Sequence, residues 1–226
     1  IYLPTQIFPM LPHNLIATNG TLSKNRKRAA LSIVVKLSPT NTLIAWEIHR
    51  SVIESDEALS YEDAELALED TDHKWHRFIH NLDNISTELM SKREASGSVE
   101  IQRPDMTIGV GDSDEIAIRI SAKNRSRKII AELMILYNTL MAEFCKSRSI
   151  PVIFRSQPTP ALNSRTEGLQ DGPYLWFMQM QGLPPAEFST IPGSHHSLGV
   201  EHYSQVSAPL RRYTDLITQR QIGHYL

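Results

Sequence analysis

Apolar residues recur along the chain with two different periods, which separates predicted strands from predicted helices. Residues 30–37 and 43–53 are rich in isoleucine, valine and leucine, and residues 39–42 between them are typical of a turn, so the two runs predict a β-hairpin. In residues 72–89 apolar side chains return every three or four positions, which predicts a helix with a core-facing stripe. Apolar residues cover most of the circumference of residues 125–148, so the longest helix is predicted to be buried.

Shorter elements are predicted between these segments. Ser60 followed three residues later by Asp63 is typical of a capping box, which would open a short helix ending near residue 68. Short strands are predicted at residues 99–101, 106–110, 115–120, 151–154 and 203–206, and ordered loops at residues 1–23, 157–173 and 182–194. Because neither a repeat nor a linker divides the chain, we expect a single mixed α+β domain of short strands around a long buried helix.

The composition is that of a globular protein. The chain has 226 residues, 41% of them hydrophobic, and its one cysteine, Cys145, lies among apolar residues at helical spacing. We therefore expect Cys145 in the core of a protein from a reducing compartment. The sequence has no apolar run near the length of a membrane span and does not begin with a charged and then apolar stretch, so neither a membrane span nor a signal peptide is visible in it. The chain begins with Ile1 and ends inside a predicted helix, so we expect a fragment truncated at both ends.

The formal net charge of −2 gives no global attraction to nucleic acid, but the basic residues are clustered. One cluster lies at residues 24–28, a second at residues 123–128, and the third consists of Arg211 and Arg212. Such clusters either line a channel while acidic residues face the solvent, or lie in solvated loops next to core elements.

The third cluster belongs to the most informative segment, which runs from Ser204 to Leu216. Ser207 is predicted to cap the last helix and Pro209 suits its first turn. Free backbone N–H groups and an arginine would then converge on one point and bind a phosphate. In the alternative interpretation, Arg211 and Asp215, four positions apart, form an exposed ion pair on a helix.

Four blocks stand in the order found in one enzyme family. The last is the segment just described. The earlier ones are Tyr2-Leu3-Pro4 with Phe8-Pro9-Met10-Leu11-Pro12 and Arg28-Ala-Ala-Leu-Ser32; Tyr61-Glu62-Asp63-Ala64 with Gly97-Ser-Val-Glu100; and Ala131-Glu132-Leu-Met-Ile-Leu-Tyr-Asn138 with Ile150-Pro151-Val-Ile-Phe-Arg155. Together they resemble the ribonuclease II/R family, processive exoribonucleases that degrade RNA from its 3′ end.

The resemblance implies a function and a set of site residues. Residues 1–226 would be part of one RNB-type catalytic domain, which hydrolyses single-stranded RNA to nucleoside 5′-monophosphates. By resemblance, Arg211 contacts the phosphate that is cut, and Arg212 positions the backbone or forms an ion pair. Tyr2 would lie near the terminal nucleotide, or be a buried tyrosine with a bonded hydroxyl. Arg28 and Ser207 are the remaining expected RNA-binding residues.

The chain also departs from the family pattern. The family usually has a serine at the position of Ala208, and the loss of that hydroxyl puts one phosphate or backbone contact in doubt. The family's metal-binding aspartates precede the Tyr-Leu-Pro block, so we expect magnesium to be the cofactor with ligands upstream of this chain, and no metal site within it. The carboxylates of residues 105–115 are interpreted as a turn and those of residues 69–72 as the start of a helix. Glu132 is either a functional carboxylate in the channel or a paired structural one.

The expected partners follow from the same resemblance. They are single-stranded RNA and flanking OB-fold modules of the same polypeptide, without a membrane. His195 and His196 are interpreted as loop residues, because no further ligand is spaced to form a zinc site with them. The expected location is the cytoplasm, or alternatively a plastid or mitochondrion. The competing hypothesis is a catalytically inactive RNA-binding relative of ribonuclease II.

Overall fold

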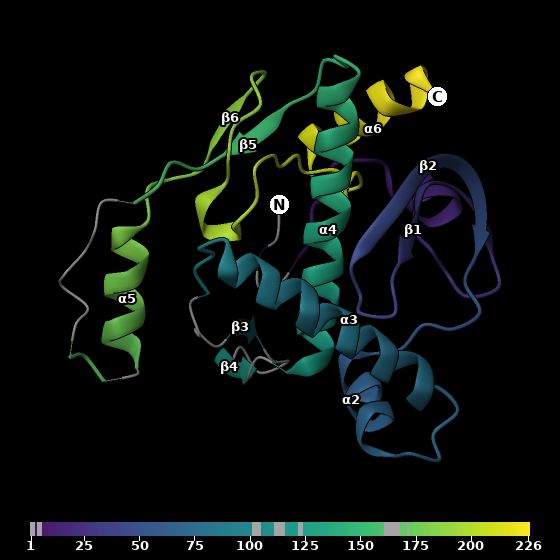
Figure 1. The fold of residues 1–226 in the computed structure, drawn as a ribbon. Coiled ribbons are helices and arrows are strands. Elements are labelled where there is room, and N and C mark those ends of the chain that lie inside the picture. The colour runs from purple at the N-terminus through teal and green to yellow at the C-terminus, as the bar shows by residue number, and fades with distance from the viewer. Residues whose placement is uncertain are drawn as a thin grey trace.

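A long helix at the centre of the computed structural model organises the other elements (Figure 1). The structure describes Leu3 and residues 6–100, 105–110, 116–121, 124–160, 168–170 and 172–226. Helix α4 (Arg125–Ser147) runs through the middle. The hairpin of β1 (Lys27–Leu37) and β2 (Leu43–Glu54) lies on one side of it, and β5 (Phe154–Ser156) with β6 (Glu187–Ser189) lies on the other. The predicted α+β class, hairpin and central helix are confirmed.

The main core forms where α4 meets the β1–β2 hairpin and the C-terminal segment. Met141, Ala142 and Cys145 on α4 have no accessible surface, and Trp46 of β2 packs edge-on against Phe144 at 6.4 Å between ring centroids. The other buried members of this core are Ile48, Ile150, Val152, Phe154, Val206 and Ile222. Cys145 is fully buried in this core, which confirms the prediction for it, and burial raises the pKa of its thiol to about 12.

A smaller core joins α2 (Tyr61–Glu69) and α3 (His76–Ala95) to the beginning of α4. The capping box is present, because Ser60 Oγ accepts from Asp63 N at 3.0 Å and an Asp63 carboxylate oxygen accepts from Ser60 N at 3.1 Å. Helix α3 begins four residues later than predicted. Residues 70–75 form turns instead, so the carboxylates of residues 69–72 end one helix and do not open the next.

Other predicted boundaries are wrong where long-range contacts decide the structure. The expected loop at residues 1–23 contains α1 (His13–Leu15) and a π-helical turn, η1 (Ile16–Gly20). Strand β5 begins three residues later than predicted, at the position where it meets β6, which lies inside an expected loop. Residues 203–206 form no strand.

The remaining elements complete the fold. Residues 99–100 are not a strand. The two short strands predicted after them are present as β3 (Asp105–Val110) and β4 (Ile116–Ser121), and they pair antiparallel. Helix α5 (Pro173–Gly182) and the short 3₁₀-helix η3 (His196–Leu198) lie on either side of β6 in the sequence. Helix α6 (Tyr213–Tyr225) ends the chain. In the described residues no helix is both long and apolar enough to cross a bilayer.

A buried ion pair connects α3 to α4 and decides the role of Glu132. The Glu132 carboxylate is buried and accepts from Arg93 Nε at 2.8 Å and from Arg93 Nη2. Arg93 Nη1 also donates to the Leu198 carbonyl at 2.9 Å, so the guanidinium joins three segments. Glu132 is therefore the paired structural carboxylate of the two alternatives.

Removal of one member of this pair is expected to be costly. Glu132→Ala leaves the partly buried guanidinium of Arg93 without its anion and should lower the free energy of unfolding by about 3–5 kcal/mol. The double variant Arg93→Met, Glu132→Leu should recover most of that loss. The control is Lys92→Ala, which removes the exposed pair with Glu88 on the same helix and should cost less than about 1 kcal/mol. Equal losses for Glu132→Ala and Lys92→Ala in urea denaturation would contradict the structural role.

Candidate functional site

Three of the predicted sequence blocks meet at one groove of 1130 Å³. Residues 7–10, 29–32 and 207–211 line it, together with Met134 and Tyr137 of α4. The remaining lining residues come from the π-helical turn and its neighbours, and from β2 and α6: His13, Ile16, Gly20, Thr21, Leu22, Ile53 and Gln219. The walls are mainly apolar. Among the described residues of the lining, Arg211 is the only arginine or lysine.

The backbone around Arg211 forms a turn that precedes α6. Arg211 N and Arg212 N both donate to the Ala208 carbonyl, at 3.2 and 3.0 Å. Helix α6 begins only at Tyr213, with Arg212 at its N-cap position and no side-chain cap. The prediction that Ser207 caps this helix and that both arginines lie in its first turn is therefore wrong, because Ala208 closes a separate turn first.

The two adjacent arginines have different environments. Arg212 forms an ion pair with the fully buried Asp215, with Nη2 2.7 Å from Oδ2, and its Nη2 also donates to Ser207 Oγ at 3.2 Å. Arg211 is exposed, and within the described part of the chain its side chain has neither an ion pair nor a hydrogen bond. The proposed Arg211–Asp215 ion pair is thus absent, and the ion pair expected of Arg212 is present.

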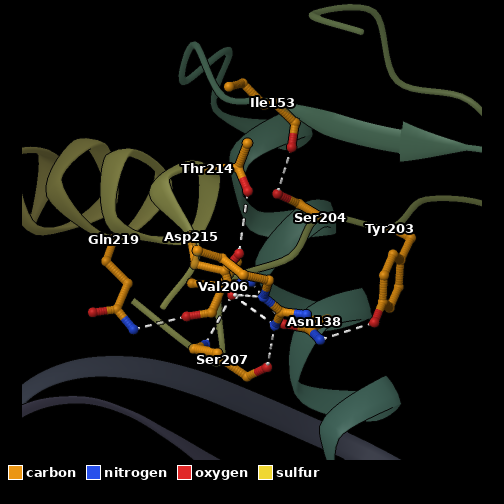
Figure 2. Close-up of polar contacts among 11 residues, drawn as sticks. Asn138, Ile153, Tyr203, Ser204, Val206, Ser207, Thr214, Asp215 and Gln219 are labelled. Atoms are coloured by element: carbon orange, nitrogen blue, oxygen red, sulfur yellow. Dashed lines mark hydrogen bonds and ion pairs between the residues drawn. The ribbon is translucent and has the colours of Figure 1, made fainter. Parts of the chain in front are cut away.

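Buried hydrogen bonds fix the segment that leads into this turn (Figure 2). Asn138 on α4 donates to the Tyr203 hydroxyl at 3.0 Å and accepts from Val206 N at 2.9 Å. Ser204 Oγ donates to the Ile153 carbonyl at 2.8 Å, and Gln219 Nε2 on α6 donates to the Val206 carbonyl at 2.7 Å. Residues 203–206 are therefore held by α4, α6 and the residue before β5 without belonging to a sheet.

Tyr137 contributes a neutral polar group to the lining of the groove. Its hydroxyl donates to the Leu31 carbonyl at 3.3 Å, and burial raises its pKa to about 12. The phenol therefore stays protonated at physiological pH. A ligand in this part of the groove would meet apolar side chains and a neutral hydroxyl, and the guanidinium of Arg211 is the one arginine or lysine charge in the described lining.

Arg28 stabilises the wall of the groove through its own hydrogen bonds. Its Nε donates to the Thr21 carbonyl at 2.9 Å, Nη1 to the Lys27 carbonyl at 2.9 Å, and Nη2 to the Ala17 carbonyl at 3.4 Å. The guanidinium thus ties the π-helical turn to β1. The RNA contact expected of Arg28 stays a prediction. Tyr2 lies outside the described residues.

The described residues do not provide a donor set for magnesium. No three histidine, cysteine, aspartate or glutamate side chains among them lie close enough to hold a metal ion. Asp112, Asp114 and Glu115 lie outside the described residues. The described lining of the groove contains no carboxylate, and Asp215, which is buried next to the turn, is paired with Arg212.

Sequence reasoning missed the residues that organise this site. Asp215 was considered only as a partner for Arg211, and Asn138 was noticed only as part of a family block. The spacing of Arg212 and Asp215, three positions apart across a helix start, is the signal for the pair that forms. The contact of Asn138 with Val206 has no local signal, because 68 residues separate them.

Comparison with known proteins relates this arrangement to a family. The family model described as RNB domain matches residues 1–226. The chain belongs to the RNB domain family. An uncharacterised ribonuclease of Synechocystis sp. is 32% identical over 228 residues, which cover 100% of this chain and 34% of that protein. The RNB chain spans about a third of the length of the curated relatives it matches.

Solved structures share the RNB fold. Mycoplasma genitalium RNase R in complex with ribose-methylated single-stranded RNA has a TM-score of 0.83 at 19% identity, over 96% of this chain and 40% of that one. Yeast Ssd1, a pseudonuclease, has a TM-score of 0.72 at 15% identity, over 98% of this chain and 32% of that one. The predicted RNB-type fold is confirmed. That fold is common to a protein named as a ribonuclease and to one named as a pseudonuclease.

His195 should make the stability of the RNB chain depend on pH. Burial, with the charge of Arg155, lowers its pKa from 6.5 to about 4, and its ring packs 5.6 Å from that of Tyr203. Because the unfolded chain binds a proton more readily, stability should be complete above pH 6.5 and fall by about 3 kcal/mol on acidification to pH 4.

The measurement is the midpoint of urea unfolding between pH 4 and 7. His195→Gln should flatten this dependence, since it removes the titrating ring. His196→Gln, the matched control on the adjacent residue, should leave the dependence unchanged. Equal slopes for the native chain and His195→Gln would show that other groups cause the acid sensitivity.

Proposed function

We propose that this chain is the RNA-gripping part of a 3′-to-5′ exoribonuclease that hydrolyses single-stranded RNA to nucleoside 5′-monophosphates. Membership of the RNB family and the similarity to ribonucleases support a ribonuclease function. The observation that carries the finer proposal is the position of Arg211. It is exposed in a groove where the separate sequence blocks meet, and it is free of the ion pair that occupies its neighbour.

The groove suits the end of a single nucleic acid strand. Its apolar walls accommodate the faces of bases, and the guanidinium of Arg211 matches the geometry of a phosphate through two parallel N–H donors. Negative charge increases on the phosphate oxygens as the bond is cut, so an arginine held there stabilises the transition state more than the ground state. In this proposal Arg212 acts through its ion pair with Asp215, and Tyr2 lies near the terminal nucleotide.

Magnesium is part of the proposal, but its ligands are not among the described residues. In a phosphodiesterase such an ion would activate water and neutralise the leaving oxygen. We place its carboxylates, and the OB-fold modules that bind RNA, in parts of the polypeptide outside residues 1–226. We place the protein in the cytoplasm, with a plastid or mitochondrion as the alternative.

The second candidate function is RNA binding without catalysis. It is favoured by the lack of a metal-binding cluster in the described residues and by the shared fold of the pseudonuclease Ssd1. Both candidates keep the groove and Arg211, so a measurement of RNA binding does not distinguish them. A measurement of RNA hydrolysis does, because only the first candidate is an enzyme.

The fragment and the complete polypeptide should therefore behave differently. Residues 1–226 alone should release no mononucleotides from single-stranded RNA with magnesium, because the carboxylates are supplied from elsewhere. The complete polypeptide should release them, and chelation of magnesium should stop the reaction. The measurement is the release of nucleoside 5′-monophosphates from RNA that is labelled along its whole length. An inactive complete polypeptide that still binds RNA would favour the second candidate.

Loss of Arg211 should lower turnover much more than affinity. Arg211→Ala in the complete polypeptide should cost about 3–4 kcal/mol of transition-state stabilisation, a fall in kcat of about 10²–10³-fold, because many other contacts share RNA binding. Arg211→Lys should recover little of the rate, since an ammonium group lacks the planar fork. Single-turnover rates and RNA affinity measured by fluorescence anisotropy distinguish the two effects.

The matched control is Arg220→Ala, which removes an exposed arginine of α6 that does not line the groove. It should leave kcat unchanged. A native rate in Arg211→Ala, or equal losses of rate and affinity, would rule out the role of Arg211 as the phosphate contact.

A further inference from the structure

One carboxylate oxygen closes the turn that carries Arg211. Asp215 has no accessible surface, and its Oδ2 accepts from Ala208 N at 2.8 Å and from Arg212 Nε at 3.0 Å, while Arg212 Nη2 lies 2.7 Å away. The hydroxyl of Thr214 lies 3.3 Å from the other oxygen, Oδ1. Figure 2 shows these contacts converging on the first turn of α6, where the helix has no side-chain cap and a carboxylate is electrostatically favoured.

Both polar backbone groups of Ala208 are used to fix this turn. Its N–H donates to Asp215, and its carbonyl accepts from Arg211 N and Arg212 N. Residues 208–212 are therefore held at their beginning by the buried carboxylate and at their end by the start of α6. The Cα atom of Arg211 lies inside this closed loop, so its position depends on the contact between Asp215 and Ala208.

The same carboxylate determines which arginine remains available. A buried aspartate strongly attracts any nearby guanidinium, because an unpaired charge is costly away from water. Arg212 satisfies that attraction, and its Nη1 lies 3.2 Å from the oxygen of the Gln205 amide when this amide is oriented toward the guanidinium groups of Arg212 and Arg155. Arg211 is then left without a competing anion, on the side of the turn that faces the groove.

We propose that Asp215 is the positioning residue of the phosphate site: by capturing Ala208 N–H and the Arg212 side chain, it fixes the turn and reserves Arg211 for the substrate. The inference rests on the proposed function, because it concerns the reaction in which Arg211 takes part. Asp215 itself is fully buried and does not line the groove. Its effect on the reaction therefore passes through Arg211.

A double-mutant cycle in the complete polypeptide tests this dependence. Asp215→Asn keeps the size of the side chain but removes the charge that holds Arg212, so kcat on single-stranded RNA should fall about 10–100-fold with KM changed less than about threefold. The double variant Arg211→Ala, Asp215→Asn should be no slower than Arg211→Ala alone, because the effect of Asp215 disappears once Arg211 is absent. If Asp215 only stabilised the fold, the losses of kcat in the two single variants would multiply in the double variant.

The matched control is Thr214→Val, which removes the neighbouring hydroxyl at Oδ1 but leaves Oδ2 and its three contacts. It should keep kcat within about twofold of the native value. Near-ultraviolet circular dichroism and the melting temperature establish that each variant is folded.

A second variant covers the case in which Asp215→Asn does not fold. Arg212 is partly exposed, so Arg212→Gln should be tolerated, and it leaves the buried carboxylate free to attract Arg211 away from the groove. It should reduce kcat, and should add no further loss to Arg211→Ala. A native kcat in Arg212→Gln, or losses that multiply in either cycle, would overturn the positioning role. A native kcat in Arg211→Ala would instead refute the proposed function.

Discussion

The side chain of Asn138 on α4 is buried, so the donor and the acceptor of its amide both need partners within the protein. The Tyr203 hydroxyl and the backbone N–H of Val206 supply them. This requirement places residues 203–206 against the central helix although they have no sheet to join. The turn with Arg211 and helix α6 continue from that segment, so their positions depend on one satisfied buried amide.

The parts of the fold that local signals determine were predictable from the sequence. The β1–β2 hairpin follows from two apolar runs around a turn, and the start of α2 follows from Ser60 and Asp63. The start of α6 was not predictable from Ser207 and Pro209, because the preference of a serine for the N-cap is worth about 1 kcal/mol. A buried carboxylate that satisfies Ala208 N and Arg212 together outweighs it.

The candidate site shows the same division. The family blocks were recognised from the sequence, but only the structure shows that residues 7–10, 29–32 and 207–211 line one groove. Which of two adjacent arginines is paired depends on the direction in which each side chain leaves the turn. Sequence spacing suggested Arg211 as the partner of Asp215, but the turn closed by Ala208 directs Arg212 to it. A pairing decided by backbone geometry does not appear in a residue pattern.

The buried thiol of Cys145 can be used to detect the opening of the core by its chemical modification. Cys145 is the single cysteine and has no accessible surface, so an alkylating reagent does not reach it in the folded state. Its pKa is raised to about 12, so the reactive thiolate does not form there at physiological pH. It lies in the core that joins α4 to the hairpin and to Val206. Alkylation at this one sulfur therefore follows the opening of that core, and a mass change of one adduct reports the opening without any engineered probe.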